Sequence, residues 1–304
     1  MTTYTYKQPV SFGEHRLMVR PRESFDQHLL SAELLVDPEP VEVRWLQDVF
    51  GNSVAVASFD RHATGLSFCS TARVDHRPGE VNQVHLEDYA RLYPFTYASE
   101  EMPDLLRSIE RQHPDPQRAV DNWARRFVHL GGTTDTLAML ADMTAAIRRE
   151  FTYVPRAEKG TQSPIETLAC RRGTCRDYAL LMIEAARALG LAARFVSGYV
   201  YSAGGARGGE AGERVGGGST HAWVRVYLPG SGWVEFDPTN GIVGNDGLIR
   251  VAVARDLHQA VPISGTYNGF PGSFLSMDVA VDITVETPNL SRTAPCATPP
   301  VPAT

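Results

Sequence analysis

Three side chains suited to nucleophilic catalysis occur in the order Cys175, His221 and Asp237. Cys175 follows Gly173 and Thr174 and opens a segment with helical periodicity. The N-terminus of a helix carries a partial positive charge of about half an elementary charge, which favours a thiolate over a thiol. Its unpaired backbone N–H groups can also stabilise a developing oxyanion. Because a thiolate needs a base, and the base an orienting group, the three residues together predict a catalytic triad.

His221 and Asp237 lie in two segments that predict a β-hairpin. The first segment, THAWVRVYL, alternates in polarity, so His221 falls on the face opposite the apolar residues. The second segment, WVEFDP, returns after a glycine-containing turn. If opposed residue numbers sum to 460, with Leu228 across from Gly232, His221 and Asp237 become diagonal neighbours on one face, with backbones about 7–8 Å apart. We predict this register, with a loop of odd length and Gly230 or Gly232 in a left-handed conformation, because the alternative sum of 461 separates the two residues.

Each candidate also has a structural interpretation. A cysteine at a helix start is most often a small buried residue. Asp237 precedes Pro238 and could simply cap the turn, which would leave Asn240 to orient the imidazole. Cys170 and Cys175 lack a second pair of cysteines or histidines at ligand spacing, so we expect no metal site and no bound cofactor.

The surrounding segments predict an α+β fold. Short alternating runs separated by turns over residues 4–97 are typical of a β-sandwich. Helical periodicity and cap residues predict helices over residues 116–130 and 134–151, from Ser163 onward, and from Cys175 to Gly190. We expect three parts: an N-terminal β-sandwich domain (1–97), a catalytic domain (98–287) and a flexible Pro/Thr-rich tail (288–304).

A glycine-rich segment directly precedes His221. Residues 203–218 contain eight glycines in sixteen positions. Such a composition predicts a mobile segment, which would serve as a lid over the site or be a disordered loop.

Two blocks, GTCRDYALLMIEAARALGLAARFVSGYV and THAWVRVYLPGSGWVEFDPTNG, resemble the transglutaminase-like superfamily of cysteine enzymes. The N-terminal motifs PRESFDQH and DVFGNSV resemble the region that precedes the catalytic core in bacterial members, and residues 251–269 resemble their C-terminal block. The resemblance implies a papain-like core, in which a helix bearing the cysteine packs on an antiparallel sheet. It also implies that Cys175, His221 and Asp237 form the catalytic triad.

The function that this resemblance implies is acyl transfer from a peptide or amide through a thioester, as a peptidase, an amidase or a peptide-modifying enzyme. Two alternatives remain open. Arylamine N-acetyltransferases also order their triad as Cys, His, Asp, and a degenerate member would be a non-catalytic peptide-binding scaffold. The sequence leaves open whether the thioester passes to water or to an amine.

Length and composition narrow the class of partner and compartment. The 304 residues allow about two domains and a sizeable core. A net charge of −6 with no basic cluster gives no indication of a nucleic-acid site. The chain has no run of about 18–20 apolar residues and no signal-peptide pattern at its start, so we expect a cytoplasmic protein with reduced thiols, with no membrane partner and an undetermined oligomeric state.

Overall fold

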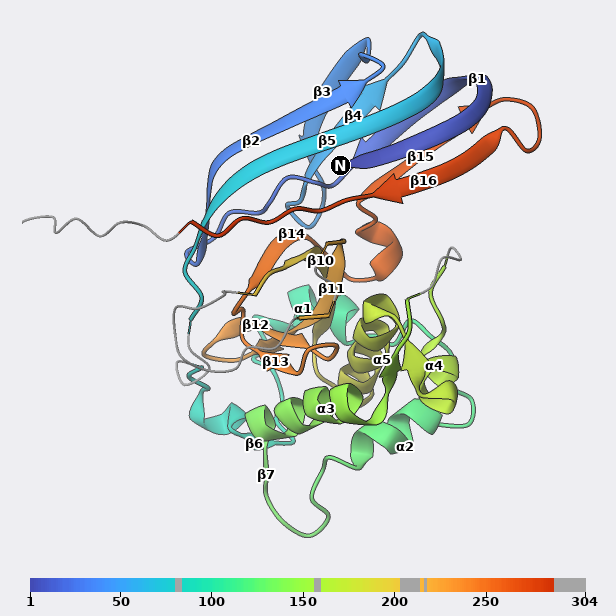
Figure 1. The fold of residues 1–304 in the computed structure, drawn as a ribbon. Coiled ribbons are helices and arrows are strands. Elements are labelled where there is room, and N and C mark those ends of the chain that lie inside the picture. The colour runs from blue at the N-terminus through green and yellow to red at the C-terminus, as the bar shows by residue number, and fades with distance from the viewer. Residues whose placement is uncertain (80–83, 156–159, 203–213, 216–217, 287–304) are drawn as a thin grey trace, which may run out of the picture.

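The computed structural model describes residues 1–79, 84–155, 160–202, 214–215 and 218–286. Two main antiparallel sheets lie one above the other, and the helices gather around the second (Figure 1). The strands of the N-terminal sheet are β1 (Thr2–Leu17), β2 (Gln27–Asp37), β3 (Glu42–Gln47), β4 (Ser53–Ser58), β5 (His62–His76), β15 (Ile263–Asn268) and β16 (Phe274–Val279). The central sheet has the order β13 (Ile242–Val243), β12 (Gly232–Asp237), β11 (His221–Leu228), β10 (Ala193–Val200) and β14 (Leu248–Ala254).

In the sequence, most of the helices and short strands lie between β5 and β10. The α-helices are α1 (Met102–Ile109), α2 (Ala119–Arg125), α3 (Thr136–Glu150), α4 (Pro164–Cys170) and α5 (Cys175–Ala188). The described residues also contain two 3₁₀ turns, η2 (Asp88–Ala90) and η3 (Leu257–Gln259). Two small strand pairs complete the fold: β6 (Leu92–Tyr93) with β7 (Thr134–Asp135), and β8 (Thr152–Tyr153) with β9 (Arg172–Gly173). This mixed architecture, with a helix-bearing core and N-terminal strands, confirms the predicted fold class.

The N-terminal sheet departs from the predicted division of the chain in one respect. The long strand β1 pairs with β4 and β5, but also with β15 and β16 from the C-terminal part of the chain. Hydrogen bonds therefore join all seven strands into one sheet around its own apolar core, rather than leaving residues 1–97 as a separate sandwich. Residues 263–279 thus belong to this sheet, although they lie within the range 98–287 predicted for the catalytic domain.

The central hairpin has the predicted register. Leu228 pairs with Gly232, and the ladder continues to Val224 opposite Phe236, so opposed residues sum to 460. The loop between the strands has three residues, and both Gly230 and Gly232 have positive φ (92° and 69°). The left-handed conformation that an odd-length loop requires is one that glycine adopts without steric cost, which explains why the chain carries glycine at both positions.

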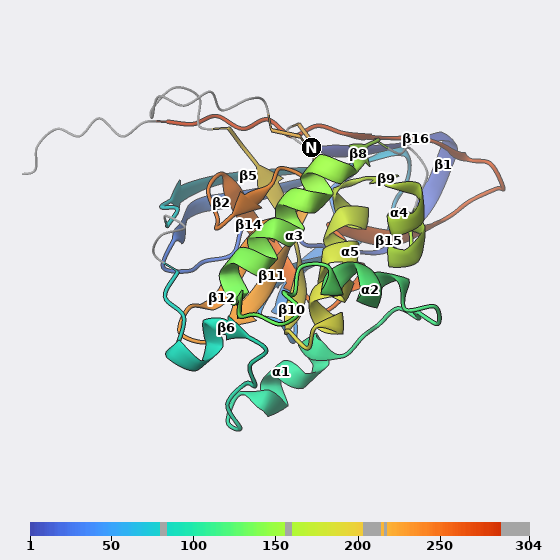
Figure 2. The ribbon, with the colours of Figure 1, turned by 90° about the horizontal axis from the view of Figure 1, so that it is seen from below.

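Helices α3 and α5 cover one face of the central sheet. Helix α5 packs on β10 and β11, and α3 packs on β12 and β13 (Figure 2). Helix α3 begins as predicted, with Asp135 accepting a hydrogen bond from the Ala138 N–H at 2.8 Å. Helix α2 is shorter than predicted, because Asp115 accepts from the N–H groups of residues 119–121 and so fixes the start of the helix at Ala119.

Two side-chain amides from the N-terminal region close the outer edge of β14. Gln27 donates to the Arg250 carbonyl (2.9 Å) and accepts from the Arg250 N–H (2.8 Å). Asn52 makes the same pair of bonds with Val253, at 2.8 Å each. Both amides are fully buried. They occupy the hydrogen-bonding groups that an edge strand otherwise leaves unpaired.

Replacing either amide should therefore destabilise the whole protein. We expect Asn52→Ala to lower the free energy of unfolding by about 2–4 kcal/mol, because two buried backbone groups lose their partner. Gln47→Ala, on exposed β3, is the matched control and should cause little change. Urea denaturation followed by circular dichroism measures both, and equal losses for the two variants would contradict this role of Asn52.

Candidate active site

Cys175 is the first residue of α5, as the sequence predicts. Thr174 precedes the helix, and its N–H and hydroxyl both donate to the Asp177 carboxylate, at 2.8 and 3.0 Å. Asp177 also accepts from the Gln162 N–H at 2.7 Å and is fully buried, so it is a capping residue and not a solvated one. A Cβ on Gly173 would come within 3.0 Å of the Asp177 side chain, which shows why glycine stands there.

His221 and Asp237 form a direct pair at the end of the central hairpin. Nε2 of His221 lies 2.8 Å from Oδ2 of Asp237, and both side chains are completely buried. Asp237 also accepts from the Thr239 N–H (2.9 Å) and from Nδ2 of Asn240 (2.7 Å). The two residues that the sequence predicted to meet do meet, and Asn240 supports Asp237 instead of replacing it.

Charge attraction between the two side chains and their hydrogen bonds together oppose the effect of burial on this pair. Burial alone would raise the pKa of Asp237, but the neighbouring His221, Asn240 and Thr239 outweigh it and hold that pKa below its usual range. Burial would lower the pKa of His221, but the Asp237 carboxylate and the Cys175 side chain outweigh it and raise that pKa well above its usual range. Both directions favour an imidazolium beside a carboxylate over a neutral pair.

The second ring nitrogen of His221 is left for the thiol. Within the described part of the chain, Nδ1 is buried and has no hydrogen bond of ordinary geometry. Cys175 is close enough to act on the pKa of His221, although the contact is looser than a formed hydrogen bond. Such bonds are often long before substrate binds. Cys175 itself is 7% exposed, which leaves the thiol the most accessible of the three groups.

Tyr153 is a neighbour that the sequence analysis missed. Its strand, β8, pairs with β9 so that Tyr153 lies beside Gly173, and the Val154 N–H donates to the Gly173 carbonyl at 3.0 Å. Burial and the adjacent Cys175, Asp177 and Asp237 raise the pKa of Tyr153 to about 12. The hydroxyl thus keeps its proton beside the sulfur. A two-residue strand has too little periodicity to reveal such a placement.

The two tryptophans of the central hairpin, Trp223 and Trp233, have different surroundings. Trp223 is fully buried and stacks on His221, with ring centroids 5.9 Å apart and planes inclined by 26°. Trp233 instead packs against Tyr227 and lies under the Arg194 guanidinium. Only Trp223 is in contact with the candidate triad.

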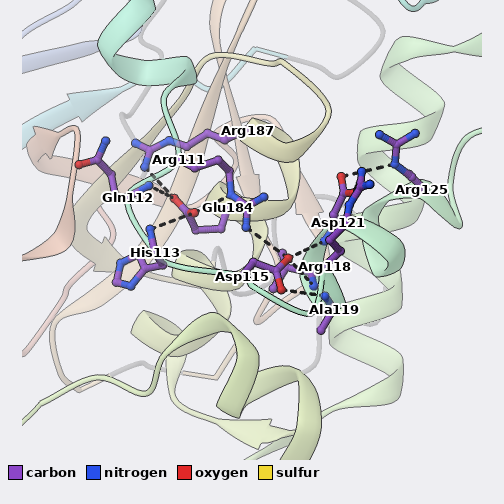
Figure 3. A network of polar contacts seen from close by, with 11 residues as sticks. Arg111, Gln112, His113, Asp115, Arg118, Ala119, Asp121, Arg125, Glu184 and Arg187 are labelled. Carbon is purple, nitrogen blue, oxygen red and sulfur yellow. Dashed lines mark hydrogen bonds and ion pairs between the residues drawn. The ribbon is translucent and has the colours of Figure 1, made fainter.

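The far half of α5 is fixed by a second polar cluster. Glu184 is fully buried and accepts from Nε of Arg111 (2.8 Å), from the backbone N–H groups of residues 112 and 113, and from Arg187 (3.0 Å). Figure 3 shows these groups converging on the Glu184 carboxylate. The cluster ties the loop before α2 to the helix that carries Cys175, and so helps to hold that helix in place.

The parts of the chain described by the structure contain no group of three or more His, Cys, Asp or Glu side chains placed to hold a metal ion. No helix among these residues has the length and apolar character needed to cross a membrane. The glycine-rich segment lies outside the described residues except for residues 214–215 and 218, and the predicted tail, 288–304, lies wholly outside them.

Comparison with solved structures first supports the fold. A crystal structure from Cytophaga hutchinsonii, described as "a putative cysteine protease", superposes with a TM-score of 0.65 at 22% identity, over 94% of this chain and 90% of that one. The core of this chain is a helix that begins with cysteine and packs on an antiparallel sheet. That sheet carries the His–Asp pair.

The family follows from the sequence models. Residues 121–238 match the transglutaminase-like superfamily, and residues 1–75 match the bacterial transglutaminase-like N-terminal region. The chain therefore combines a transglutaminase-like core with a bacterial transglutaminase-like N-terminal region. An uncharacterized protein of Mycobacterium leprae is 26% identical over 93% of this chain and 96% of its own length, and one of Mycobacterium tuberculosis is 28% identical over 93% and 90%.

Proposed function

We propose that the protein is a cysteine-dependent acyl-transfer enzyme that acts on a peptide or protein amide. Cys175 is the nucleophile, His221 the general base and acid, and Asp237 the residue that orients the imidazole. The observation that carries the proposal is the buried 2.8 Å contact between Nε2 of His221 and Asp237, which leaves Nδ1 for the thiol at the start of α5.

The proposed reaction has two halves. The Cys175 thiolate attacks the carbonyl carbon, a C–S bond forms, and the oxyanion develops beside the first backbone N–H groups of α5. The His221 imidazolium then gives its proton to the amine as the C–N bond breaks, which leaves a thioester. In the second half, His221 removes a proton from water or from an acceptor amine, and attack on the thioester frees the thiol.

Two neighbours support these roles. Asp237 retains its charge inside the protein, so it can stabilise the imidazolium throughout the cycle. Tyr153, which stays protonated next to Cys175, can donate a hydrogen bond to the thiolate in the resting enzyme. An intact set of such groups argues for catalysis over a non-catalytic scaffold, and the match to the transglutaminase-like core favours amide chemistry over transfer from an acyl-coenzyme A.

We also propose a reducing, cytoplasmic setting, since a thiolate nucleophile must stay reduced. In the described residues Cys69, Cys170 and Cys175 are all free thiols.

Alkylation by iodoacetamide tests the proposed nucleophile. We expect Cys175 to react at least about tenfold faster than Cys69 at pH 6.5, although Cys69 is more exposed, because only Cys175 lies beside an imidazolium. Peptide mapping by mass spectrometry gives both rates in the same sample. Cys170, which is exposed and near the same helix, is the internal control for access.

A Cys175 no faster than either control would overturn the proposed mechanism. A peptide-amide library incubated with wild type and with Cys175→Ala then identifies the acyl group held as a thioester. Release as free acid or as a new amide separates hydrolysis from transamidation, and acetyl-coenzyme A should remain unhydrolysed.

A further inference from the structure

The Asn240 side chain makes contacts in two directions. On one side Nδ2 donates to Oδ2 of Asp237 at 2.7 Å, the same oxygen that faces His221. On the other side Nδ2 donates to the Val215 carbonyl at 3.1 Å, and Oδ1 accepts from the Val215 N–H at 2.9 Å. Both amide hydrogens are thus in use, one on the candidate triad and one on a segment 25 residues earlier in the chain.

Arg214, the residue before Val215, is held by contacts of its own. The Arg214 guanidinium donates to the Tyr201 carbonyl (3.0 Å) and to the Asp246 carboxylate (2.6 Å). A Cβ at Gly247 would overlap Nη1 of Arg214, so the absence of a side chain at Gly247 creates the space that the guanidinium fills. Arg214 and Val215, which we call the strap, are therefore held by an ion pair at one residue and an amide at the other.

Of the two strap residues, Val215 contacts Asn240 directly. The Val215 backbone fixes the plane of the Asn240 amide, because it engages both Oδ1 and Nδ2. That plane aims the remaining Nδ2 hydrogen at Asp237. If the strap leaves, the Asn240 amide can rotate, and Asp237 loses one of its aligned donors while still buried beside His221.

We propose that Asn240 is a positioning residue that couples docking of the strap to the orientation of the Asp237 carboxylate, and through it to the reactivity of Cys175. The proposal rests on the proposed function. The charged and titratable groups around the thiol come from four elements: His221 on β11, Asp237 on β12, Asp177 on α5 and Tyr153 on β8.

A double-mutant cycle tests the coupling in the full-length chain. The rate of Cys175 alkylation by iodoacetamide is measured at pH 6.5 in two backgrounds, wild type and Arg214→Ala. In each background the rate is compared with and without the Asn240→Ala substitution. We expect Asn240→Ala to slow alkylation about tenfold when the strap is docked, and less than about threefold in the Arg214→Ala background, because the strap no longer orients the amide there. The ratio within one background cancels any change in access to the thiol.

Asp246→Ala provides a second undocked background with the opposite change in charge. If the strap orients Asn240, the effect of Asn240→Ala on the alkylation rate should be as small in Asp246→Ala as in Arg214→Ala. A direct effect of charge on the thiol would instead change the alkylation rate in opposite directions in these two backgrounds. Arg107→Ala, which removes an exposed arginine on α1, is the matched control and should preserve the tenfold factor. Asn240→Ser serves in place of the alanine variant if that variant loses its far-ultraviolet circular dichroism.

A spectroscopic signature separates positioning from a general loss of stability. The downfield proton resonance of His221 Nε2–H, hydrogen-bonded to Asp237, should shift or broaden in Asn240→Ala, Arg214→Ala and Asp246→Ala but not in Arg107→Ala. Equal Asn240 effects in all backgrounds, with an unchanged resonance, would overturn the coupling. A wild-type Cys175 no faster than Cys69 would instead overturn the proposed function, and the inference with it.

Discussion

Replacing Asp237 by alanine should lower the pKa of His221 from its raised value and slow Cys175 alkylation at pH 7 by about 100-fold or more. His221 is completely buried, and burial on its own pushes an imidazole toward the neutral form. Asp237 is the principal group that opposes this effect. Without it, the ring stays neutral and no longer stabilises a neighbouring thiolate. Titration of the His221 ring protons by NMR measures the first effect, and peptide mapping measures the second.

The same pair gives a prediction for stability against pH. The raised pKa of His221 stabilises the fold fully below the ordinary histidine value of 6.5, and this is lost as pH rises through the folded value. The lowered pKa of Asp237 stabilises the fold above the ordinary value of 3.8, and this is lost as pH falls. Wild type and Asp237→Ala should therefore differ most in the free energy of unfolding between about pH 4 and 6.5.

Asp104→Ala, on the exposed side of α1, is the control for removing one carboxylate and should leave the His221 titration unchanged. An Asp237→Ala protein that keeps the wild-type titration of His221, or the wild-type reactivity of Cys175, would remove Asp237 from the mechanism.

Replacing Arg250 by alanine should be the most destabilising change outside the triad, at about 3–5 kcal/mol. Arg250 on β14 bridges two carboxylates, Asp26 from the N-terminal region and Glu235 from β12, and all three side chains are at most 9% exposed. Its contact with Glu235 is 3.0 Å, and it donates to both oxygens of Asp26. Truncation leaves the buried Asp26 carboxylate without its guanidinium partner and leaves Glu235 with the longer 3.8 Å contact to Arg225. Urea denaturation at pH 7 measures the loss.

The free energy of unfolding measured at acidic pH tests the same ion-pair network. Burial would raise the pKa of Asp26, but hydrogen bonds and the charge of Arg250 outweigh it and lower that pKa to about 2. Its stabilisation is present above the ordinary value of 3.8 and is lost as pH falls toward 2, about 2 kcal/mol in all. Arg250→Ala should show almost none of this acid loss, because the ion pair is already gone.

Arg73→Ala is the matched control, since it removes an arginine from an ion pair whose two side chains are 67% and 69% exposed. We expect no measurable change there, because exposed pairs contribute little. Equal effects of Arg250→Ala and Arg73→Ala would contradict a structural role for the buried network.

The local parts of the structure could be predicted from the sequence. The register of the central hairpin follows from side-chain alternation and from the glycines of its loop, and Cys175 at a helix start follows from the apolar spacing of α5. These local features are sufficient to predict that His221 lies next to Asp237.

The long-range parts could not be predicted in this way. Strands β15 and β16 carry ordinary strand patterns, and nothing in them specifies β1, some 250 residues earlier, as the partner. The placement of Tyr153 depends on a two-residue strand pair, and that of Asn240 on a contact across 25 residues. Neither has a periodicity that a sequence pattern could reveal.

The side-chain amides on the outer edge of β14 have a consequence for protein engineering. Gln27 and Asn52 belong to the segment that a truncated chain starting at residue 98 would omit. Such a fragment would retain Cys175, but the backbone N–H and C=O groups on the outer edge of β14 would be unpaired. Strands β15 and β16 would also lack their pairing partner, β1. We expect it to self-associate rather than to work as an independent module.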